Sequence, residues 1–249
     1  MLAARGLSIR FGGVAAVDDV SIAVPAGQLA ALIGPNGAGK TTLFALLSGF
    51  LLPETGRVEF AGNDITGGKP HAACRLGLAR TFQIVQPFAT QTVRENIAVG
   101  AHLRVRSRRA ALAAAEDVAQ RVGLAAELDK PAGALTIAGR KRLELARALA
   151  TRPKLLLLDE VLAGLNPQEV AAMIPVVRAI RDGGVTVLMI EHVMQAVMSL
   201  ADHVHVLAGG RMIAAGPPAA IAADPRVIEA YLGHGTARRL GATPGIVHD

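Results

Sequence analysis

The sequence of 249 residues has no Trp, one Tyr and one Cys, and aromatic residues make up only 3% of it. The single Cys74 excludes an intramolecular disulfide framework and a cysteine-based zinc site. The shortage of aromatic rings argues against a protein that stacks single-stranded nucleic acid. No run of about 20 apolar residues occurs, which is the length that crosses a bilayer. The longest uncharged stretch, Val20 to Gly39, is interrupted by Pro25 and Pro35.

The N-terminal residues also lack the apolar core of a signal peptide, so we expect a soluble intracellular protein. Lys and Arg number 26 against 20 Asp and Glu, which gives a net charge of +6. This balance favours an anionic partner, such as a phosphate group, a nucleic acid or an acidic lipid surface, without choosing among them. Hydrophobic residues make up 51% of the chain. Such an apolar excess leaves room for a surface that contacts a partner protein.

Two short apolar runs, Leu155 to Leu158 and Val185 to Ile190, are typical of buried parallel strands. The segment between them, Gln168 to Asp182, is predicted to be a helix, because Asn166 supplies an N-cap and Gly183 follows its end. A strand, a helix and a second strand in this order form a βαβ unit. The sequence therefore predicts an α/β core with a mainly parallel sheet.

Composition and turn signals predict the remaining elements. Short strand segments are expected over Val14 to Val24, a strand at Leu29 to Ile33 and short strand pieces from Gly56 to Ile65. Helices are expected at Thr41 to Phe50, Arg106 to Val122, Leu143 to Ala150 and from Asp224 to Gly233. The remaining residues, 234–249, are rich in Gly, Pro and Thr, so we expect a flexible tail there.

A glycine-rich segment stands between the strand expected at Leu29 to Ile33 and the helix that follows it. It consists of Gly34, Pro35, Asn36, Gly37, Ala38, Gly39, Lys40, Thr41 and Thr42. The pattern G-x-x-x-x-G-K-[ST] in this context predicts a phosphate-binding loop, because its backbone N–H groups can surround an anion at a helix N-terminus. Lys40 is predicted to reach the β and γ phosphates and Thr41 to bind Mg²⁺. The alternative is a glycine-rich turn without a ligand.

Two adjacent carboxylates, Asp159 and Glu160, follow the four leucines of a predicted strand. A nucleotide hydrolase needs a carboxylate near Mg²⁺, and Asp159 is predicted to fill that role through bound water. Glu160 is predicted to be the base that orients or deprotonates the attacking water. The alternative is a pair of solvated loop acids. The sequence has no Asn-Lys-x-Asp guanine motif, and the long interval between Lys40 and Asp159 leaves room for an inserted subdomain.

Taken together, these motifs resemble the ATP-binding subunit of an ABC transporter, and the resemblance covers nearly the whole chain up to Gly233. It implies an α/β P-loop cassette with a RecA-like parallel-sheet core, an antiparallel β subdomain and an inserted helical subdomain. The implied boundaries are 1–233 for the ATP-binding domain, with the helical subdomain at about 84–153 inside it. ATP and Mg²⁺ are the implied ligands.

The resemblance also assigns roles to residues outside the phosphate loop. Gln83 resembles the Q-loop glutamine, which approaches Mg²⁺ and the water while its loop touches the membrane subunit. His192 resembles the switch histidine that contacts the γ-phosphate, which makes it a catalytic residue beside Glu160. Phe11, ahead of the first predicted strands, occupies the place of the aromatic residue that stacks on adenine. Residues 163–166 resemble the D-loop, and 135–149 align with the family's signature segment.

This signature departs from the usual Leu-Ser-Gly-Gly-Gln. It reads Leu135, Thr136, Ile137, Ala138 and Gly139. In the family's dimer the segment of one subunit faces the γ-phosphate bound to the other, so the resemblance places Thr136, Ala138 and Gly139 at ATP. Ile137 and Ala138 add side chains where the backbone approaches phosphate, whereas Arg140 and Lys141 are expected to compensate in part as cations at this anion site. We therefore expect a composite site that closes but is weaker than usual.

Within the family, the segments RTFQ, AGLNP, EHVM and DPRVIEAYLG resemble the branched-chain amino acid importers. The implied partners are ATP, a second ATP-binding subunit, two transmembrane permease subunits and, indirectly, a periplasmic solute-binding protein, but no nucleic acid. The implied location is the cytoplasmic, inner face of the cell membrane. Alternatives are an importer ATPase for urea or short amides, a soluble ABC-type ATPase of an assembly complex, and a regulatory subunit with poor hydrolysis.

Overall fold

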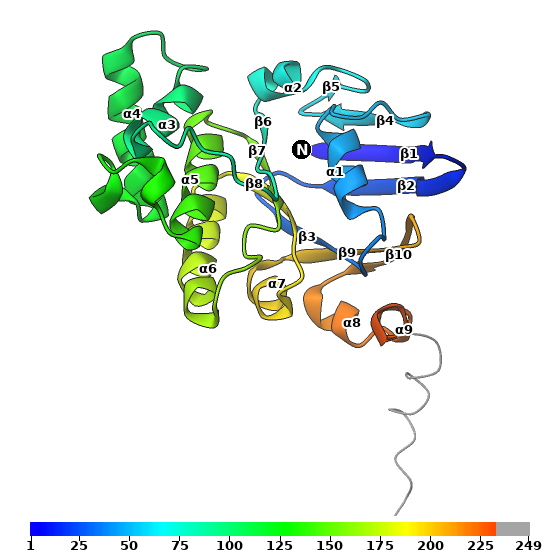
Figure 1. Ribbon diagram of the computed structural model, residues 1–249. Coiled ribbons are helices and arrows are strands. Elements are labelled where there is room, and N and C mark those ends of the chain that lie inside the picture. The colour runs from blue at the N-terminus through cyan, green and yellow to red at the C-terminus, as the bar shows by residue number, and fades with distance from the viewer. Residues whose placement is uncertain (233–249) are drawn as a thin grey trace, which may run out of the picture.

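The computed structural model describes residues 1–232, and the expected tail at 234–249 lies outside them. A six-stranded sheet stands at the centre of the fold, with a four-stranded antiparallel sheet on one side and a group of helices on the other (Figure 1). This arrangement confirms the α/β cassette with a parallel-sheet core, an antiparallel β subdomain and a helical subdomain.

The six-stranded sheet has the order β10-β9-β3-β8-β7-β6, in which only the β10–β9 pair is antiparallel. Its strands are β3 (Leu29–Ile33), β6 (Leu78–Arg80), β7 (Leu155–Asp159), β8 (Thr186–Ile190), β9 (His203–Ala208) and β10 (Arg211–Gly216). Every residue of β3, β7 and β8 is buried, as expected for parallel strands that are covered on both faces. Helix α6 (Pro167–Asp182) joins β7 to β8 and is capped by Asn166, which confirms the predicted βαβ unit.

The antiparallel sheet has the order β2-β1-β4-β5. Its strands are β1 (Leu2–Phe11), β2 (Val14–Val24), β4 (Thr55–Phe60) and β5 (Asn63–Asp64). The prediction of short segments over Val14–Val24 is wrong, because β2 is one continuous strand paired along its length with β1. The position given to Phe11 is also wrong: it does not precede the first strands but ends β1, which the sequence did not predict.

Helix α1 (Lys40–Leu47) lies between the two sheets. Its buried residues Leu43, Phe44 and Leu47 share a core with residues of β1 and β2 and with one face of the central sheet. The helix ends three residues before the predicted Phe50. The chain leaves the helix there because Gly49 adopts a left-handed conformation with φ of +76°.

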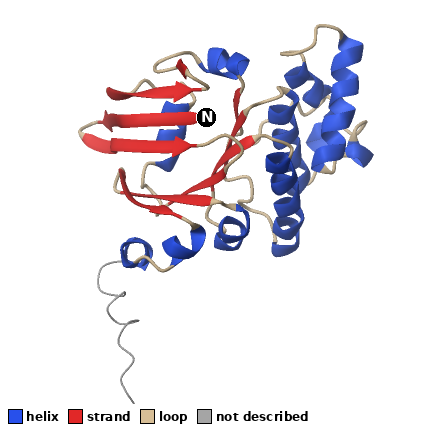
Figure 2. Ribbon diagram, turned by 180° about the vertical axis from the view of Figure 1, so that it is seen from behind, coloured by secondary structure: helices blue, strands red, loops and turns tan. Residues whose placement is uncertain are grey.

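Helices α3 (Val93–Ala101), α4 (Arg108–Val122) and α5 (Ile137–Ala150) form the helical group. Figure 2 shows this group across the central sheet from the antiparallel sheet. Both predicted helices in this region are present, with changed starts. Ser107 caps α4 and Thr136 caps α5, so α4 begins two residues later and α5 six residues earlier than predicted.

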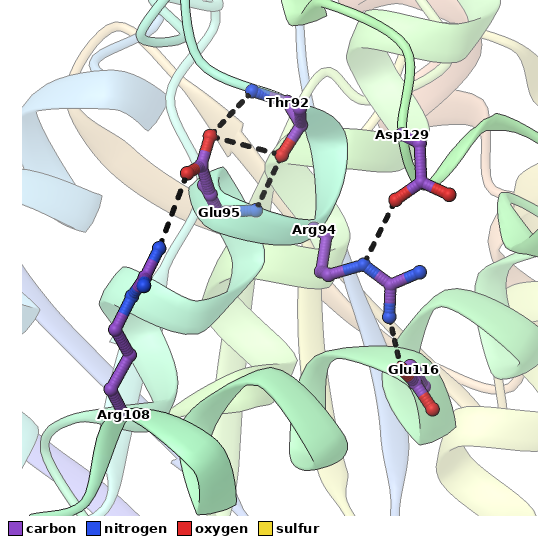
Figure 3. A network of polar contacts seen from close by, with 6 residues as sticks. All are labelled: Thr92, Arg94, Glu95, Arg108, Glu116 and Asp129. Atoms are coloured by element: carbon purple, nitrogen blue, oxygen red, sulfur yellow. Dashed lines mark hydrogen bonds and ion pairs between the residues drawn. The ribbon is translucent and has the colours of Figure 1, made fainter.

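A network of polar contacts joins α3, α4 and the segment before α5 (Figure 3). It consists of Thr92, Arg94, Glu95, Arg108, Glu116 and Asp129. Thr92 and Glu95 form a capping box at the start of α3, and Arg94 contacts both Asp129 and Glu116. Exposed ion pairs contribute little individually. We assign most of the stabilisation to the capping box and to the buried alanines of α4, which pack in the shared core.

Shorter elements complete the fold. They are α2 (Pro70–Leu76), α7 (Met194–Leu200), α8 (Pro218–Ala222), α9 (Pro225–Leu232) and two 3₁₀ turns, η1 (Ala125–Glu127) and η2 (Ala132–Ala134). Within residues 1–232, none of the helices combines the length and the apolar character that a bilayer span requires. The described part of α9 starts at Pro225, next to the predicted Asp224.

Leu157→Ala is expected to lower the free energy of unfolding by about 2–5 kcal/mol, because Leu157 is fully buried in β7 and its loss leaves a cavity. Urea unfolding of the full chain measures this change. Leu52→Ala is the control, since Leu52 is 69% exposed and its truncation should cost less than about 0.5 kcal/mol. Similar losses in the two variants would contradict the burial argument.

Candidate functional site

The predicted phosphate loop connects the end of β3 to the start of α1. Gly39 adopts φ of +100°, and a Cβ there would lie 2.1 Å from the backbone oxygen of Ala16 in β2. A Cβ on Gly34 would lie 1.9 Å from the backbone oxygen of Leu207 in β9. Both positions therefore require glycine, because the loop is pressed against a strand of each sheet.

Lys40, the first residue of α1, folds back over this loop. Its Nζ donates hydrogen bonds to the backbone oxygens of Gly34 at 2.8 Å and Pro35 at 2.9 Å. Burial lowers the pKa of Lys40, and the carboxylates of Glu160 and Asp159 offset part of this effect. The lysine is thus held beside the loop, close to the two carboxylates that the sequence singled out.

A cavity of about 590 Å³ opens over the loop. Its lining comprises Ala16, Asn36, Gly37, Ala38, Gly39, Lys40, Thr41, Thr42, Gln83, Glu160 and His192. Residues from the ends of β3, β7 and β8 and from the segment after β6 therefore meet in one space, although they are far apart in the sequence. Ala16 was not among the predicted site residues, since nothing in its local sequence marks it.

Glu160 is the centre of the polar contacts in this cavity. Its Oε2 accepts a hydrogen bond of 2.7 Å from Gln83 Nε2, and its Oε1 lies 2.7 Å from His192 Nε2. Its backbone has φ of +50°, a left-handed conformation that costs a non-glycine residue about 1–3 kcal/mol. The backbone N–H of Glu160 donates to Ile190 O at 3.0 Å, which helps to hold this conformation. The three predicted residues thus form one connected group.

Asp159 lies beside this group and is 2% exposed. Its Oδ2 pairs with the Arg80 guanidinium at 2.8 Å, and that guanidinium also lies over the rings of Phe44, Phe50 and Phe82. Within the described chain, Asp159 Oδ1 is buried without a hydrogen-bond partner. Sequence reasoning missed Arg80, whose neighbours come from three different parts of the chain.

The residues around Asp159 fit a magnesium ion. Asp159, Thr41 and Gln83 line a second cavity of about 550 Å³. Their carboxylate, hydroxyl and amide oxygens are of the kind that Mg²⁺ prefers, and the unpartnered Oδ1 provides a free acceptor. The arrangement is compatible with the predicted metal role of these three residues.

The signature residues lie apart from the phosphate loop of their own chain. Thr136 caps α5 by accepting a hydrogen bond of 3.1 Å from the Gly139 N–H, and Ile137 is 62% exposed. Thr136, Ala138 and Gly139 are not among the described residues that line the phosphate cavity. Their predicted contact with ATP therefore requires a second chain. Phe11, half exposed at the end of β1, is likewise not in that lining.

The predicted role of Lys141 as a cation at this signature site is wrong. Lys141 is buried, and its Nζ donates to two backbone oxygens of its own chain. Arg140 donates to the Gly133 oxygen at 2.9 Å. The pattern of α5 explains the difference, because position 141 faces the core together with Glu144 and Leu145.

Two neighbouring histidines lie outside the site. His203 and His205 lie on one face of β9 with ring centroids 4.8 Å apart. Burial lowers the pKa of His205 to about 4, so it is neutral near pH 7. In residues 1–232, no group of three or more His, Cys, Asp or Glu side chains is placed to hold a metal ion.

The fold and the site together define a P-loop nucleotide-binding cassette. The ABC transporter family model matches residues 17–163, and a model described as branched-chain amino acid ATP-binding cassette transporter matches residues 211–237. The chain belongs to the ABC transporter family, whose cassettes are ATPases.

Named relatives agree with this assignment. The chain is 40% identical to the high-affinity branched-chain amino acid transport ATP-binding protein BraF of Pseudomonas aeruginosa, with 94% of this chain and 98% of BraF covered. It is 38% identical to LivG of Salmonella typhimurium, which carries the same description, over the same shares. A solved structure of the ADP conformation of an ATP-binding cassette from an ABC transporter matches with a TM-score of 0.85 and 33% identity, over 94% of this chain and 99% of that one.

Glu191, between β8 and His192, is a buried carboxylate that sequence reasoning did not single out. It is 1% exposed, and its Oε1 accepts a hydrogen bond of 2.9 Å from the Leu162 N–H. Burial raises the pKa of Glu191 to about 7, with a smaller contribution from the Glu160 charge; backbone hydrogen bonds from Leu162 and His192 and, less strongly, the Lys141 charge act in the opposite direction. The folded chain therefore holds a proton near pH 6 that the unfolded chain releases.

Stability should consequently fall as pH rises from about 4.5 to about 7 and then level off, because the raised pKa favours the protonated native state. In Glu191→Gln this contribution is absent, so its free energy of unfolding relative to wild type should rise by about 3 kcal/mol over that range. Urea unfolding at pH 5, 6, 7 and 8 measures the difference. The exposed Glu59→Gln serves as control. A difference that does not change with pH would refute the assignment.

Proposed function

We propose that the chain is the ATP-binding and ATP-hydrolysing subunit of an ABC importer for branched-chain amino acids. The observation that carries the proposal is the convergence of the phosphate loop, Gln83, Glu160 and His192 on one cavity. The substrate class is supported by the names of the relatives and by the family model that matches residues 211–237. It is also the class that the short sequence segments favour.

In the proposed reaction the loop N–H groups and Lys40 bind the phosphates of ATP. Glu160 accepts a proton from the attacking water, and each of its oxygens is already held, one by Gln83 and the other by His192. One of these contacts has to open so that water can approach the carboxylate. When bound, Mg²⁺ supplies positive charge to the phosphates, and Thr41, Gln83 and Asp159 are the residues that would hold it.

A surface next to the site supports a membrane partner. Phe82, Ile84 and Phe88, on both sides of Gln83, are 42%, 75% and 45% exposed. Phe82, Phe50 and Arg147 contribute to the lining of a cavity of about 310 Å³, and the Arg147 guanidinium also lies over the Phe88 ring. Exposed apolar residues gathered near a cavity mark a protein contact surface. We assign this surface to a permease subunit, and the location that we propose for the chain is the inner face of the cell membrane.

The complete assembly would contain two ATP-binding subunits, two permeases and, outside the membrane, a solute-binding protein. Thr136, Ala138 and Gly139 lie outside the phosphate cavity of their own chain, so the second ATP-binding subunit, identical or different, would bring them to the nucleotide. Binding of ATP then favours the closed pair by the difference in its affinity for the closed and open states. Hydrolysis removes the ATP that stabilises the closed pair, so the pair can open.

Glu160→Gln is expected to retain ATP binding but to lower phosphate release and uptake at least about a hundredfold, because the amide cannot accept the proton. The measurement uses the assembled transporter in proteoliposomes, with nucleotide binding, phosphate release and uptake of labelled leucine recorded together. Lys40→Ala is the contrasting variant, since it should lose ATP binding itself. Hydrolysis at the wild-type rate in Glu160→Gln would remove the base from this role.

Wild-type uptake of leucine should be inhibited by unlabelled isoleucine and valine and not by urea or acetamide. Inhibition by the amides alone would instead support an importer for urea or short amides. Purification in a stable soluble complex without membrane subunits would favour an assembly ATPase. ATP binding without hydrolysis in the assembled wild type would identify a regulatory subunit.

Replacing Ile137 and Ala138 together by Gly should raise the ATPase rate of the assembled transporter a few-fold. The physical reason is a closer approach of the α5 N-terminus to phosphate, worth about one backbone hydrogen bond or about 1 kcal/mol. Steady-state phosphate release measures the effect, and thermal unfolding checks that the two glycines do not destabilise α5. Equal rates for the double variant and the wild type would contradict a weakened signature.

A further inference from the structure

Lys141 is a buried cation in the helical group whose partners are backbone oxygens. The residue is 7% exposed, and its Nζ donates to Glu160 O at 3.0 Å and to Gln83 O at 3.3 Å. Among residues 1–232, no carboxylate lies within ion-pair distance of this Nζ. From a greater distance, the charge of Lys141 acts to lower the pKa of Glu144 and of Glu191. A buried ammonium needs compensation, and the two carbonyl dipoles contribute to it.

The two carbonyls belong to the two residues whose side chains meet in the site. Gln83 Nε2 donates to Glu160 Oε2, so these residues are joined twice, once by their side chains and once through Lys141. The second connection acts on the backbone, which in Glu160 is left-handed. A strained backbone persists only where its surroundings hold it. Lys141 is one such restraint, and the Glu160 N–H bond to Ile190 O is another.

Helix α5 supplies this restraint from outside the central sheet. Lys141 lies in the second turn of α5, four residues after Ile137 at its N-terminus. The helix packs mainly on α3 and α4, whereas Gln83 and Glu160 follow β6 and β7 of the central sheet. The two hydrogen bonds of Lys141 therefore cross from the helical group to the hydrolysis site. A change in the orientation of α5 would act directly on the backbone of both site residues.

We propose that Lys141 is a positioning residue, which fixes the backbone of Glu160 and Gln83 and thereby makes the geometry of the base depend on the orientation of α5. This inference rests on the proposed ATPase function, because it assigns a role in the same site. Lys141 is not among the described residues that line the phosphate cavity. Its loss should therefore affect the rate of hydrolysis and leave nucleotide binding to the phosphate loop nearly unchanged.

Lys141→Met tests this role, since it keeps the length and apolar stem of the side chain but removes the donor. In the assembled transporter, we expect ATP to bind within threefold of the wild-type Kd and kcat to fall about tenfold or more. Lys141→Arg keeps a cationic donor and should recover most of the lost kcat. Lys130→Met is the matched control, because Lys130 pairs with Glu127 on the surface and should behave like the wild type.

Hydrogen exchange on the full chain gives a readout independent of activity. Peptides that cover Glu160 and Gln83 should exchange faster in Lys141→Met than in the wild type or in Lys130→Met, while peptides from α1 should not change. If Lys141→Met does not fold, Lys141→Gln takes its place, because an amide can still donate to one of the two carbonyls; it should exchange faster at the same peptides and lose part of kcat.

The proposal would be overturned if a folded variant without the ammonium kept the wild-type kcat and exchange pattern. It would also be overturned if Lys141→Met lost ATP binding and kcat in proportion, or if Lys141→Arg recovered nothing. These outcomes are separate from failure of the proposed function. If the proposed function itself were wrong, the wild-type transporter would bind or hydrolyse no ATP.

Discussion

Burial of the central parallel sheet on both faces is the constraint on which the site depends. Because every residue of β3, β7 and β8 is buried, the polar side chains of the site lie at or just beyond the ends of these strands. Parallel strands bring their carboxyl ends to the same edge of a sheet. The phosphate loop, the acidic pair Asp159–Glu160 at the end of β7 and the pair Glu191–His192 after β8 therefore meet there. Apolar core packing and the chemistry of the site are two results of the same arrangement.

Ionisable side chains are buried where this edge meets the helical group. Arg80 pairs with Asp159 and lies over three aromatic rings, Lys141 donates to two backbone oxygens, and Glu191 accepts the N–H of Leu162. Buried ionic groups are a poor source of stability, because the loss of hydration offsets their attraction. Their placement at a junction between structural units is therefore better explained by a role in holding defined backbone positions around Glu160.

Much of the core could be predicted because its signals are local. Four leucines followed by two acids define β7, and Asn166 with Gly183 brackets α6. The phosphate loop could also be predicted, because its glycines form a recognisable pattern in the sequence. By contrast, β1, the place of Phe11 and the inward direction of Lys141 depend on partners distant in the chain. Lys141 follows the signature segment, so the sequence grouped it with an anion site, whereas the face of α5 that it occupies turns it inward.

Two glycines of the phosphate loop also connect the two sheets of the cassette. Gly39 rests on a backbone oxygen of β2 and Gly34 on one of β9, so this single loop contacts both sheets. A ligand that binds only the folded loop adds its binding free energy to the stability of the fold, about 2.7 kcal/mol at a hundred times its Kd. Because the loop contacts both sheets, this binding free energy stabilises the packing of the two sheets together. ATP would thus stabilise the fold of the cassette as well as being its substrate.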